Sequence, residues 1–428
     1  MRILYNLLIC LLQVPLACYW LVRAALNSSY RAGLGQRFGV GYPELDSSIW
    51  IHAVSVGEVQ AAVPLIQRLA DQYPERALLV TTVTPTGAAR VAAVFGDRVT
   101  HAYIPFELPP AVDRFFAAVN PRLALIMETE IWPNLYRGCG TRGIPLILVS
   151  ARISPRSVGS YRRFMPLFRE TLSHGIIIAA QSEADAERFR ALGASPARTR
   201  VTGNIKFDIE LPARLPADGN ALRTRLFGDR PVWIAASTHD REEQAVLAAH
   251  AALTARHPDL LLVLVPRHPQ RFADVRTLVE RSGFDCVARS DGRACRPETG
   301  VFLGDTMGEL PLFYAASDVA FVGGSLVPVG SHNLLEPAAL GLPVLIGPHV
   351  FNAQDIADLF CAEGACRMVH DADELAAAVD EFLADPEAAR RVGALGRQIV
   401  ERNRGALARL LEMLTPLLEM RPTPHRER

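Results

Sequence analysis

The feature that most constrains the fold is a repeated alternation of short apolar runs with helical patterns. Residues 48–54 and 77–83 are mostly apolar, and helical patterns follow them at 58–72 and after the turn at 85–87. Strands that are buried on both faces and are each followed by a helix are typical of a doubly wound parallel sheet. The same alternation predicts further strands at 123–127, 145–149 and 176–180.

A second series of the same kind follows Asp208, with predicted strands at 232–236, 260–265, 318–322 and 343–346. A chain of 428 residues is longer than one hydrophobic core usually serves, so we expect two domains. The stretch 211–219 is rich in proline and polar residues and is typical of a linker. We therefore predict an N-terminal lobe, a linker and a C-terminal lobe that ends in a long helix (residues 29–208, 209–219, 220–428 and 387–414, respectively).

The N-terminal segment, residues 3–22, is apolar enough to associate with a membrane. Twenty helical residues span about 30 Å, close to the thickness of a bilayer core. The arginines that follow the segment favour a cytosolic position for the rest of the chain (Arg23, Arg31 and Arg37). We predict a membrane anchor over 1–28, as a spanning helix or as a helix in the membrane plane. A cleaved signal peptide is less favoured, since no convincing small-x-small site follows.

Composition excludes several classes of function. Lys+Arg and Asp+Glu are both 45, so the net charge is zero. The overall charge therefore does not point to a nucleic-acid partner. The seven cysteines lack CxxC spacing, and neither HExxH, GxGxxG nor a P-loop occurs. The sequence therefore predicts no metal site and no cofactor, and it disfavours dinucleotide oxidoreductases and NTPases.

In the second half, motifs that could hold a nucleotide follow two predicted strands and one further short apolar run. Gly323 and Gly324 end one strand, and a helix is predicted to begin near Asn333. Glycines allow close approach of a ligand, and the free N–H groups of a helix start favour a phosphate. Glu336 could accept two ribose hydroxyls. The alternative is a structural turn with an asparagine N-cap.

The other two segments are 266–269 and 304–310. Arg267 follows a predicted strand and could pair with a phosphate or carboxylate, or could be a solvated loop residue. Backbone groups of 304–310 could contact a base edge, or the segment could simply be a capped helix start.

In the first half, acidic residues follow two predicted strands. Glu58 is either a general base or the last residue of a Ser-x-x-Glu capping box that begins at Ser55. Glu128 and Glu130, next to Trp132, suggest a sugar site, although two exposed loop acids would give the same pattern. Lys206 could face an anionic donor or could be a surface lysine.

Taken together, the motifs resemble those of bacterial 3-deoxy-D-manno-octulosonic acid (Kdo) transferases of lipopolysaccharide synthesis. The segments that carry the resemblance occur in order along most of the chain: HAVSVGEV (52–59), TTVTPTG (81–87), METEIWPN (127–134), VTGNIKFD (201–208), PRHPQRF (266–272), GDTMGEL (304–310) and VGGSLVPVGSHNLLEP (322–337). The resemblance implies the GT-B fold, which consists of two Rossmann-like doubly wound lobes with an interlobe cleft, here with an N-terminal membrane-anchor helix.

The resemblance also implies substrates and residue roles. The donor would be CMP-Kdo, and the acceptor would be the precursor of lipid A at the cytoplasmic side of the cell inner membrane. Glu58 matches the family's catalytic base, and Glu128 and Lys206 match positions that stabilise the transition state. The residues that match the CMP-binding segments are Pro266, Arg267, Met307, Gly308, Glu309, Asn333, Leu334, Leu335 and Glu336. The family often has Pro-Leu-Glu after the asparagine, where this chain has Leu334-Leu335-Glu336.

The expected reaction is a direct displacement that inverts the anomeric centre and releases CMP. Glu58 would take the proton of an acceptor hydroxyl, and Arg267 with the helix start near Asn333 would stabilise the leaving phosphate. Two alternatives stay open here. One is another GT-B enzyme with a diphosphate donor, such as a heptosyltransferase or a nucleotide-sugar epimerase. The other is an inactive membrane-bound nucleotide-binding or scaffold protein.

Overall fold

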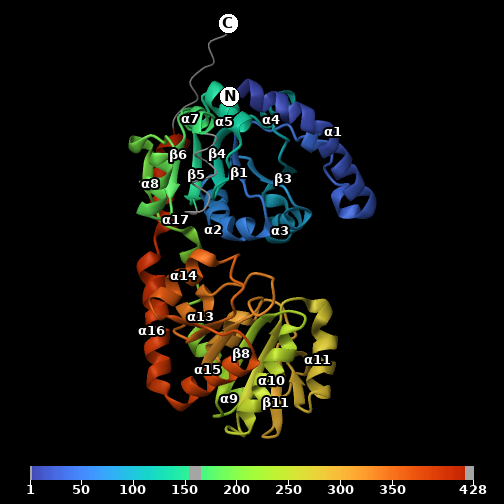
Figure 1. The fold of residues 1–428 in the computed structure, drawn as a ribbon, viewed down its shortest axis with the longest axis vertical. Helices are drawn as coiled ribbons and strands as arrows, with labels where there is room; N and C mark the ends of the chain where they lie inside the picture. The colour runs from blue at the N-terminus through green and yellow to red at the C-terminus, as the bar shows by residue number, and fades with distance from the viewer. Residues whose placement is uncertain (1, 154–164, 420–428) are drawn as a thin grey trace. The chain divides into compact units, whose positions relative to one another are not determined.

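The computed structural model describes residues 2–153 and 165–419, which form two compact units (Figure 1). The first unit comprises residues up to Asp208 together with the segment from Arg404, and the second comprises Ile209–Asn403. Each unit is built on one parallel sheet flanked by helices. The predicted α/β class with two doubly wound lobes is therefore confirmed.

The described part of the first unit holds a seven-stranded sheet in the order β3-β2-β1-β4-β5-β6-β7. Its strands are β1 (Ser48–His52), β2 (Leu78–Thr82), β3 (Thr100–Tyr103), β4 (Pro121–Met127), β5 (Leu146–Ala151), β6 (Ile177–Ala180) and β7 (Thr199–Val201). The intervening helices are α2 (Val56–Gln72), α3 (Pro85–Phe95), α4 (Pro109–Val119), α5 (Pro133–Thr141), α7 (Met165–Leu172), α8 (Glu183–Ala191) and the 3-10 turn η5 (Ile205–Phe207).

The described part of the second unit holds a seven-stranded sheet in the order β10-β11-β9-β8-β12-β13-β14. Its strands are β8 (Val232–Thr238), β9 (Leu261–Pro266), β10 (Asp285–Ala288), β11 (Thr299–Leu303), β12 (Val319–Val322), β13 (Val344–Ile346) and β14 (Cys366–Met368). The helices are α9 (Leu215–Leu226), α10 (Glu242–Thr254), α11 (Phe272–Arg281), α12 (Leu310–Ala315), α13 (Leu335–Ala339), α14 (Gln354–Ala362), α15 (Ala372–Ala384) and α16 (Pro386–Asn403), with the 3-10 turn η7 (Arg289–Asp291) after β10.

The central strands form because their residues can be buried on both faces. Every residue of β1, β2, β8 and β9 is buried, and side chains on the two faces of each sheet belong to separate apolar cores. These strands lie where the apolar runs predicted them. The prediction missed the edge strands, among them β7 and β14, which have two exposed residues out of three.

The predicted linker over 209–219 is wrong in its second half, because α9 begins at Leu215. Pro216 lies in the first turn of this helix, where the missing N–H removes no hydrogen bond. Gly219 packs so closely on α12 that a Cβ would lie 2.4 Å from the Cβ of Ala315. The proline and glycine that suggested a linker are therefore helix-start and helix-packing residues.

The predicted long helix at 387–414 consists of two helices, so the C-terminal lobe does not extend to 428. α16 ends at Asn403, and α17 (Ala406–Glu419) begins after Gly405, which has a φ of +87°. The Asp208 carboxylate accepts the backbone N–H groups of Gly405 and Leu407. Apolar residues of α17 complete the core of the first unit (Ala406, Leu407, Leu410, Leu414 and Leu418).

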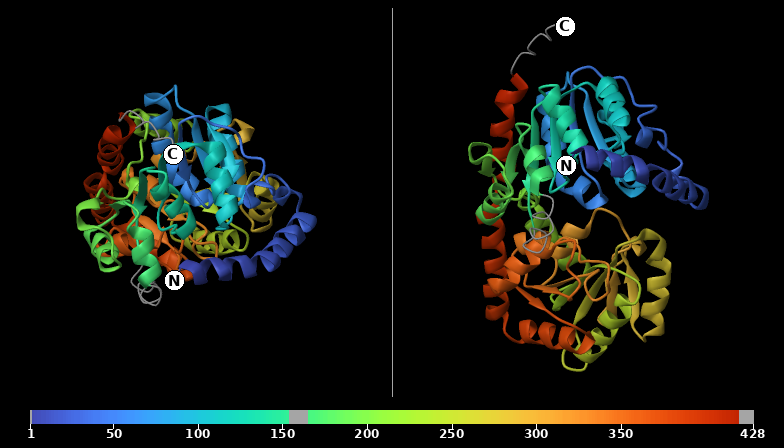
Figure 2. Two further views of the ribbon diagram at one scale, coloured as in Figure 1. Left: turned by 90° about the horizontal axis from the view of Figure 1, so that it is seen from above. Right: turned by 45° about the horizontal axis from the view of Figure 1, so that its top comes forward.

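Helix α1 (Arg2–Leu26) follows the outside of the first unit (Figure 2). Among the described helices it alone is long and apolar enough to cross a membrane, and 11% of its most apolar 18-residue window is buried. Trp20 and Ala24 are its buried residues. Most of its leucine, isoleucine and valine side chains are exposed.

Candidate active site

The acidic candidates of the first unit lie at one edge of its sheet. β1 and β4 are adjacent and parallel, with His52 in register with Ile126. Glu58 follows β1, and Glu128 follows β4 directly. Because the carboxyl ends of parallel strands meet at one edge, the fold brings these two residues together.

Glu58 lies in the first turn of α2, and its side chain folds back toward β1. One carboxylate oxygen accepts the Val54 N–H at 2.8 Å, and the other accepts the Ser55 hydroxyl at 3.3 Å. The capping-box alternative is therefore half wrong, since Ser55 is the N-cap residue but its side chain caps no backbone N–H. The half-buried carboxylate keeps acceptor positions that these two bonds do not use.

The pKa of Glu58 is raised from its ordinary value near 4.5 to about 7, chiefly because burial disfavours the charge. The carboxylates of Glu128 and Glu130 add to the rise, while the bond from Val54 opposes it. A general base works best when its pKa lies near the working pH. Glu58 therefore has the basicity that proton abstraction from a hydroxyl requires.

Glu128 is held by two cations. Its carboxylate accepts Lys206 Nζ at 2.8 Å and Arg152 Nε at 3.1 Å. Burial raises the pKa of Glu128, but the two cations and their hydrogen bonds outweigh burial and leave the pKa below its ordinary value. Its φ of +54° is uncommon for a residue with a side chain, and such backbone strain is found preferentially at functional sites.

Arg152 is a member of this cluster that the sequence analysis missed. It follows β5 directly, and β5 is the neighbour of β4 in the sheet. The rule that drew attention to Glu58 and Glu128, a polar residue just after a buried strand, would have found it. Lys206 comes from η5, where the Asn204 side chain accepts the Lys206 N–H.

The loop after Glu128 is ordered by contacts of its own. Trp132 donates its indole N–H to the Glu130 carboxylate at 3.0 Å, and its ring packs edge-on against buried His52. The Tyr136 hydroxyl donates to the Glu130 carbonyl oxygen at 2.8 Å. Burial raises the pKa of Glu130. The alternative of two exposed loop acids is therefore wrong, since both carboxylates are partly buried and hydrogen-bonded.

In the second unit, the glycine loop after β12 is held by a buried carboxylate that the sequence analysis also missed. Glu242 is fully buried at the start of α10 and accepts four backbone N–H groups, those of His239, Gly324, Ser325 and Leu326. A Cβ on Gly323 would lie 2.7 Å from a backbone oxygen of β8. The glycine pair thus serves close backbone packing, and Glu242 fixes the shape of the loop.

Asn333 and Glu336 lie at the end of this loop. The Asn333 side chain accepts the Leu335 N–H and donates to the Glu336 carboxylate, both at 3.0 Å. Leu334 and Leu335 are buried, so they can offer a ligand only their backbone groups. Helix α13 begins at Leu335, two residues later than predicted, and has five residues, which leaves it a small dipole.

Pro266 ends β9, and Arg267 follows with an exposed side chain. Near them, His239 and His332 place their Nε2 atoms 2.8 Å apart. Burial lowers the pKa of His239 to about 4 and that of His332 to about 3, so both rings are neutral at neutral pH. One ring therefore donates its N–H to the other. No sequence pattern pointed to this pair.

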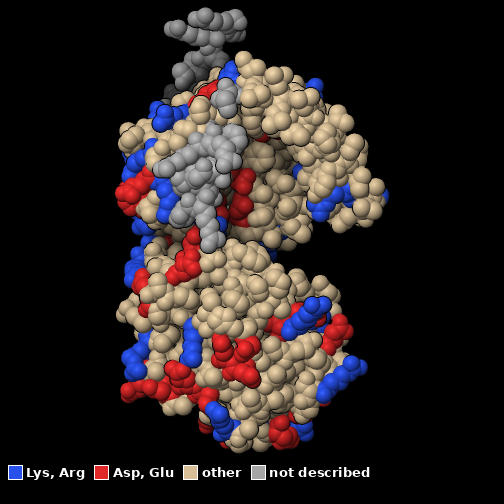
Figure 3. Space-filling view, viewed as in Figure 1, with Lys and Arg blue, Asp and Glu red and all other residues tan. Residues whose placement is uncertain are grey.

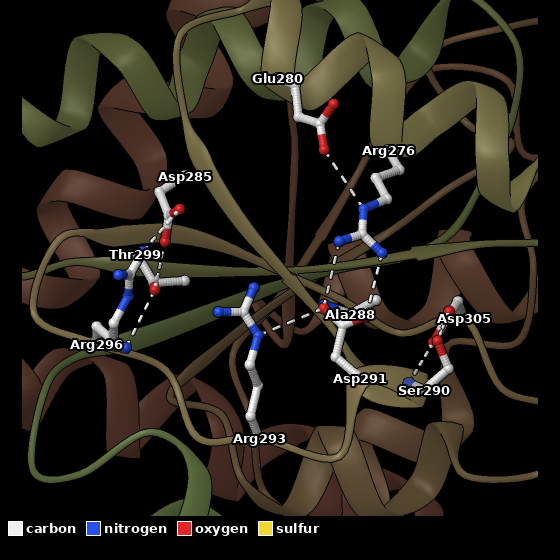
Figure 4. A network of polar contacts seen from close by, with 10 residues as sticks. All are labelled: Arg276, Glu280, Asp285, Ala288, Ser290, Asp291, Arg293, Arg296, Thr299 and Asp305. Carbon is white, nitrogen blue, oxygen red and sulfur yellow. Dashed lines mark hydrogen bonds and ion pairs between the residues drawn. The ribbon is translucent and has the colours of Figure 1, made fainter.

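The segment after β11 is held to η7 by side-chain contacts, and Figure 4 shows one of them, between Ser290 and Asp305. Asp305 accepts the N–H of Ser290 and its hydroxyl. Glu309 accepts both the Arg289 guanidinium and the Thr306 hydroxyl, and these bonds lower its pKa. Met307 and Gly308 stand exposed at the tip, with Gly308 at a φ of +84°. The Glu309 carboxylate therefore holds the loop.

Solved structures with the same architecture define the fold. UDP-GlcNAc 2-epimerase from Neisseria meningitidis matches over 87% of this chain and 100% of its own, with a TM-score of 0.56 and 14% identity. At that identity the likeness shows the fold alone. A family model described as glycosyl transferase-like matches residues 307–415. The chain has the two-lobed GT-B type of fold.

Sequence comparison then identifies the family. The family model of 3-deoxy-D-manno-octulosonic-acid transferase matches residues 32–209. The enzyme of that name from Haemophilus influenzae is 42% identical over 98% of this chain and 99% of its own length. The one from Bordetella pertussis is 36% identical over 94% and 96%. The chain belongs to the Kdo transferases, which decides against the heptosyltransferase, epimerase and scaffold alternatives.

Proposed function

We propose that this enzyme transfers Kdo from CMP-Kdo to a hydroxyl of the lipid A precursor, with inversion at the anomeric carbon. One observation carries the proposal. The carboxyl group of Glu58, whose pKa is raised to about 7, lies beside a second carboxylate, Glu128, which two cations keep ionised. Environments that push the pKa values of two neighbouring acids apart are typical of acid–base catalysis. Glu58 is the proposed base.

The chemical step is a single displacement. Glu58 accepts the proton of the acceptor hydroxyl while that oxygen forms a bond to the anomeric carbon of Kdo. The bond from this carbon to the CMP phosphate oxygen breaks, and its electron pair leaves with CMP. Because the nucleophile enters opposite the leaving group, the anomeric configuration inverts.

A role for Lys206 and Arg152 follows from charge. The Lys206 ammonium and the Arg152 guanidinium both pair with the Glu128 carboxylate. Kdo carries a carboxylate next to its anomeric carbon, and a fixed cation there stabilises the donor and the transition state. We assign Glu128 to orienting the two cations, and Lys206 with Arg152 to contacting the anionic sugar.

The donor nucleotide is assigned to the second unit. Arg267 is an exposed cation next to Pro266 and is suited to the CMP phosphate. Gly308 and Met307 at the tip of the η7-supported loop offer backbone groups to the cytosine edge, while Glu309 acts by fixing that loop. Asn333, the backbone of Leu334 and Leu335, and Glu336 are proposed to hold the ribose and phosphate.

Attachment to the inner membrane, with the catalytic body on the cytoplasmic side, is supported by α1. The surface of this helix in Figure 3 is uncharged along most of its length, with basic side chains near its end. Arg23 lies in its last turn. An apolar helix with flanking arginines binds lipid and favours anionic headgroups. The acceptor is a lipid, so attachment would keep enzyme and acceptor on the same surface.

The test is a reconstitution of the purified full chain in vesicles that contain the lipid A precursor. CMP-Kdo is supplied, UDP-linked sugars are offered in parallel, and products are read by mass spectrometry and by NMR of the anomeric centre. We expect addition of Kdo with inversion and release of CMP. Consumption of a diphosphate donor, or retention of configuration, would contradict the proposal.

A further inference from the structure

A buried carboxylate connects α1 to the acidic loop of the active site. Glu107, 3% exposed, lies in the segment before α4. Its Oε2 accepts the Tyr5 hydroxyl of α1 at 3.0 Å and the Asn134 N–H at 2.6 Å, and its Oε1 accepts the Leu135 N–H at 2.9 Å. These two N–H groups belong to the first turn of α5. Glu107 therefore holds the start of α5 and the start of α1 at once.

The Asn134 side chain makes a second connection between the same two helices. One of its amide hydrogens goes to the Asn6 side-chain oxygen at 2.8 Å and the other to the Glu107 carbonyl oxygen at 2.6 Å. Both donors of this buried amide are thereby used. Tyr5 and Asn6 are consecutive polar residues in an apolar helix, and this contact accounts for both of them.

The start of α5 is also the end of the acidic loop. Pro133 begins α5 directly after Trp132, and the Tyr136 hydroxyl of α5 donates to the Glu130 carbonyl oxygen at 2.8 Å. Trp132 in turn donates to the Glu130 carboxylate. A shift of the first turn of α5 would therefore move Trp132 and Glu130, whose charge is one of those that raise the pKa of Glu58.

Both ends of α1 contact the first unit. Near its start, Arg2 pairs with Glu170 of α7 at 2.8 Å. Near its end, the Arg37 guanidinium lies 3.8 Å from the ring centroid of buried Trp20. A helix fixed at both ends can transmit its position to the groups that it contacts, and the groups contacted by Tyr5 and Asn6 lead to the acidic loop.

We propose that α1 is a positioning element for acceptor recognition as well as a membrane attachment. Tyr5 and Asn6, acting through Glu107 and Asn134, set Glu130 and Trp132 of the acidic loop so that the loop accepts the sugar headgroup of the lipid. Tyr5 and Asn6 are positioning residues and do not touch the substrate. This inference rests on the proposed function, because it assumes a lipid acceptor at the acidic loop.

The experiment compares Tyr5→Phe with Tyr19→Phe in the full chain. Tyr19 lies on the same helix and is 50% exposed, and among the described residues it contacts Arg23 and Trp20 of α1 itself. Each change removes one hydroxyl, so both variants should partition equally into vesicles of the lipid A precursor and phosphatidylglycerol. We expect Tyr5→Phe to raise the KM for the lipid acceptor about tenfold, the effect of one hydrogen bond to a charged group. The KM for CMP-Kdo and all constants of Tyr19→Phe should be unchanged.

Hydrogen exchange of residues 128–135 gives a readout that does not depend on activity. Faster exchange there in Tyr5→Phe, but not in Tyr19→Phe, supports positioning. Equal exchange and an equal KM for the lipid acceptor in the two variants would overturn the positioning role. A rise in this KM that is fully explained by weaker vesicle binding would overturn it as well. Wild-type protein in the same vesicles tests the proposed function separately. If the wild type transfers no Kdo, that function fails, and the exchange comparison still decides whether α1 positions the loop.

Discussion

Glu58 of the first unit differs from Glu242 and Glu309 of the second in how its carboxylate is used. In the first unit, Glu58 makes two hydrogen bonds, stays half-buried and has a pKa near 7. In the second unit, Glu242 is fully buried and accepts four backbone N–H groups. The Glu309 carboxylate accepts hydrogen bonds from an arginine and a threonine. A carboxylate with unused acceptor positions can take a proton from a substrate. A carboxylate whose oxygens are filled by the protein holds a loop in shape.

This difference explains how one fold serves two tasks. The first unit presents charged side chains, so its chemistry depends on their pKa values and on the cations around them. The second unit would bind its ligand through backbone groups on loops as well as through Arg267, Asn333 and Glu336, so its proposed donor affinity depends on how firmly those loops are held. Substitutions in the first unit should therefore change turnover, and those in the second should change donor affinity.

The largest effect is expected from Glu58→Gln. The amide keeps the size of the side chain but cannot accept a proton, so turnover should fall about 10²- to 10⁴-fold, the usual contribution of a general base. Steady-state Kdo transfer measures this. CMP affinity, measured by calorimetry, should be unchanged because the nucleotide is assigned to the other unit. Turnover within a few fold of wild type would remove Glu58 from the mechanism.

The next largest effect is expected from Glu242→Gln. The new amide group places a donor against two backbone donors that the carboxylate accepted, and leaving buried donors unpaired costs about 1–3 kcal/mol each. We expect a lower denaturant midpoint for the full chain and at least tenfold weaker CMP binding. The control is Glu280→Gln, whose side chain is 56% exposed. Unchanged CMP affinity would mean that the glycine loop does not contact the nucleotide.

A pH profile sharpens the comparison further. Because burial raises the pKa of Glu58 to about 7, kcat/KM should increase tenfold per pH unit below 7 and level off above it. Glu58→Gln is the control, since its residual kcat/KM should lose this pH dependence. An apparent pKa near 4.5 in the rising part of this profile would show that Glu58 is not the group that titrates.

Stability should have the opposite pH dependence. A carboxyl whose pKa is raised by folding binds its proton more tightly in the folded state than in the unfolded chain. The free energy of unfolding therefore falls as pH rises from about 4.5 to about 7, where Glu58 and Glu107 ionise in the folded protein. Denaturant titrations at fixed pH values measure this slope, which Glu107→Gln should reduce.

The smallest effect is expected from Arg289→Gln. Arg289 holds Glu309 by two hydrogen bonds but is part of a solvated network, and Thr306 still contacts the same carboxylate. We expect the KM for CMP-Kdo to rise about two- to fivefold with kcat unchanged, since partly exposed ion pairs contribute about 1 kcal/mol or less. A fall in kcat with an unchanged KM would contradict the loop-holding role of Glu309.

Much of the fold was predictable because it depends on local patterns. The strands at 48–54 and 232–236 are apolar along their length, and only the centre of a parallel sheet buries such runs on both faces. The edge strands β7 and β14 carry exposed residues and have no such pattern. Gly219 and Gly405 illustrate the limit, since one packs within a helix and the other ends a helix, and the sequence shows only a glycine.

Family motifs led to Glu58, Glu128 and Lys206, and the positions of Glu58 and Glu128 after buried strands gave an independent reason to select those two. Their roles are proposals that rest on the contacts described above. Arg152 was overlooked although it directly follows a buried strand, whereas Glu242 stands at a helix start with no distinctive local signal. The partner of Arg152, Glu128, lies 24 residues away, and three of the four N–H groups that Glu242 accepts lie 82 or more residues away.

The sequence by itself determined the two α/β sheets, the apolar first helix and the strand ends at which the polar motifs lie. These follow from periodicity and from the sterics of individual residues, which act over a few positions. The tertiary structure decided which groups meet. It pairs Glu128 with Lys206 and Arg152, places the Tyr5 hydroxyl against Glu107, and packs α17 on the core of the first unit. Such contacts join residues far apart in the chain, and burial then sets the pKa of each group, so no local pattern contains them.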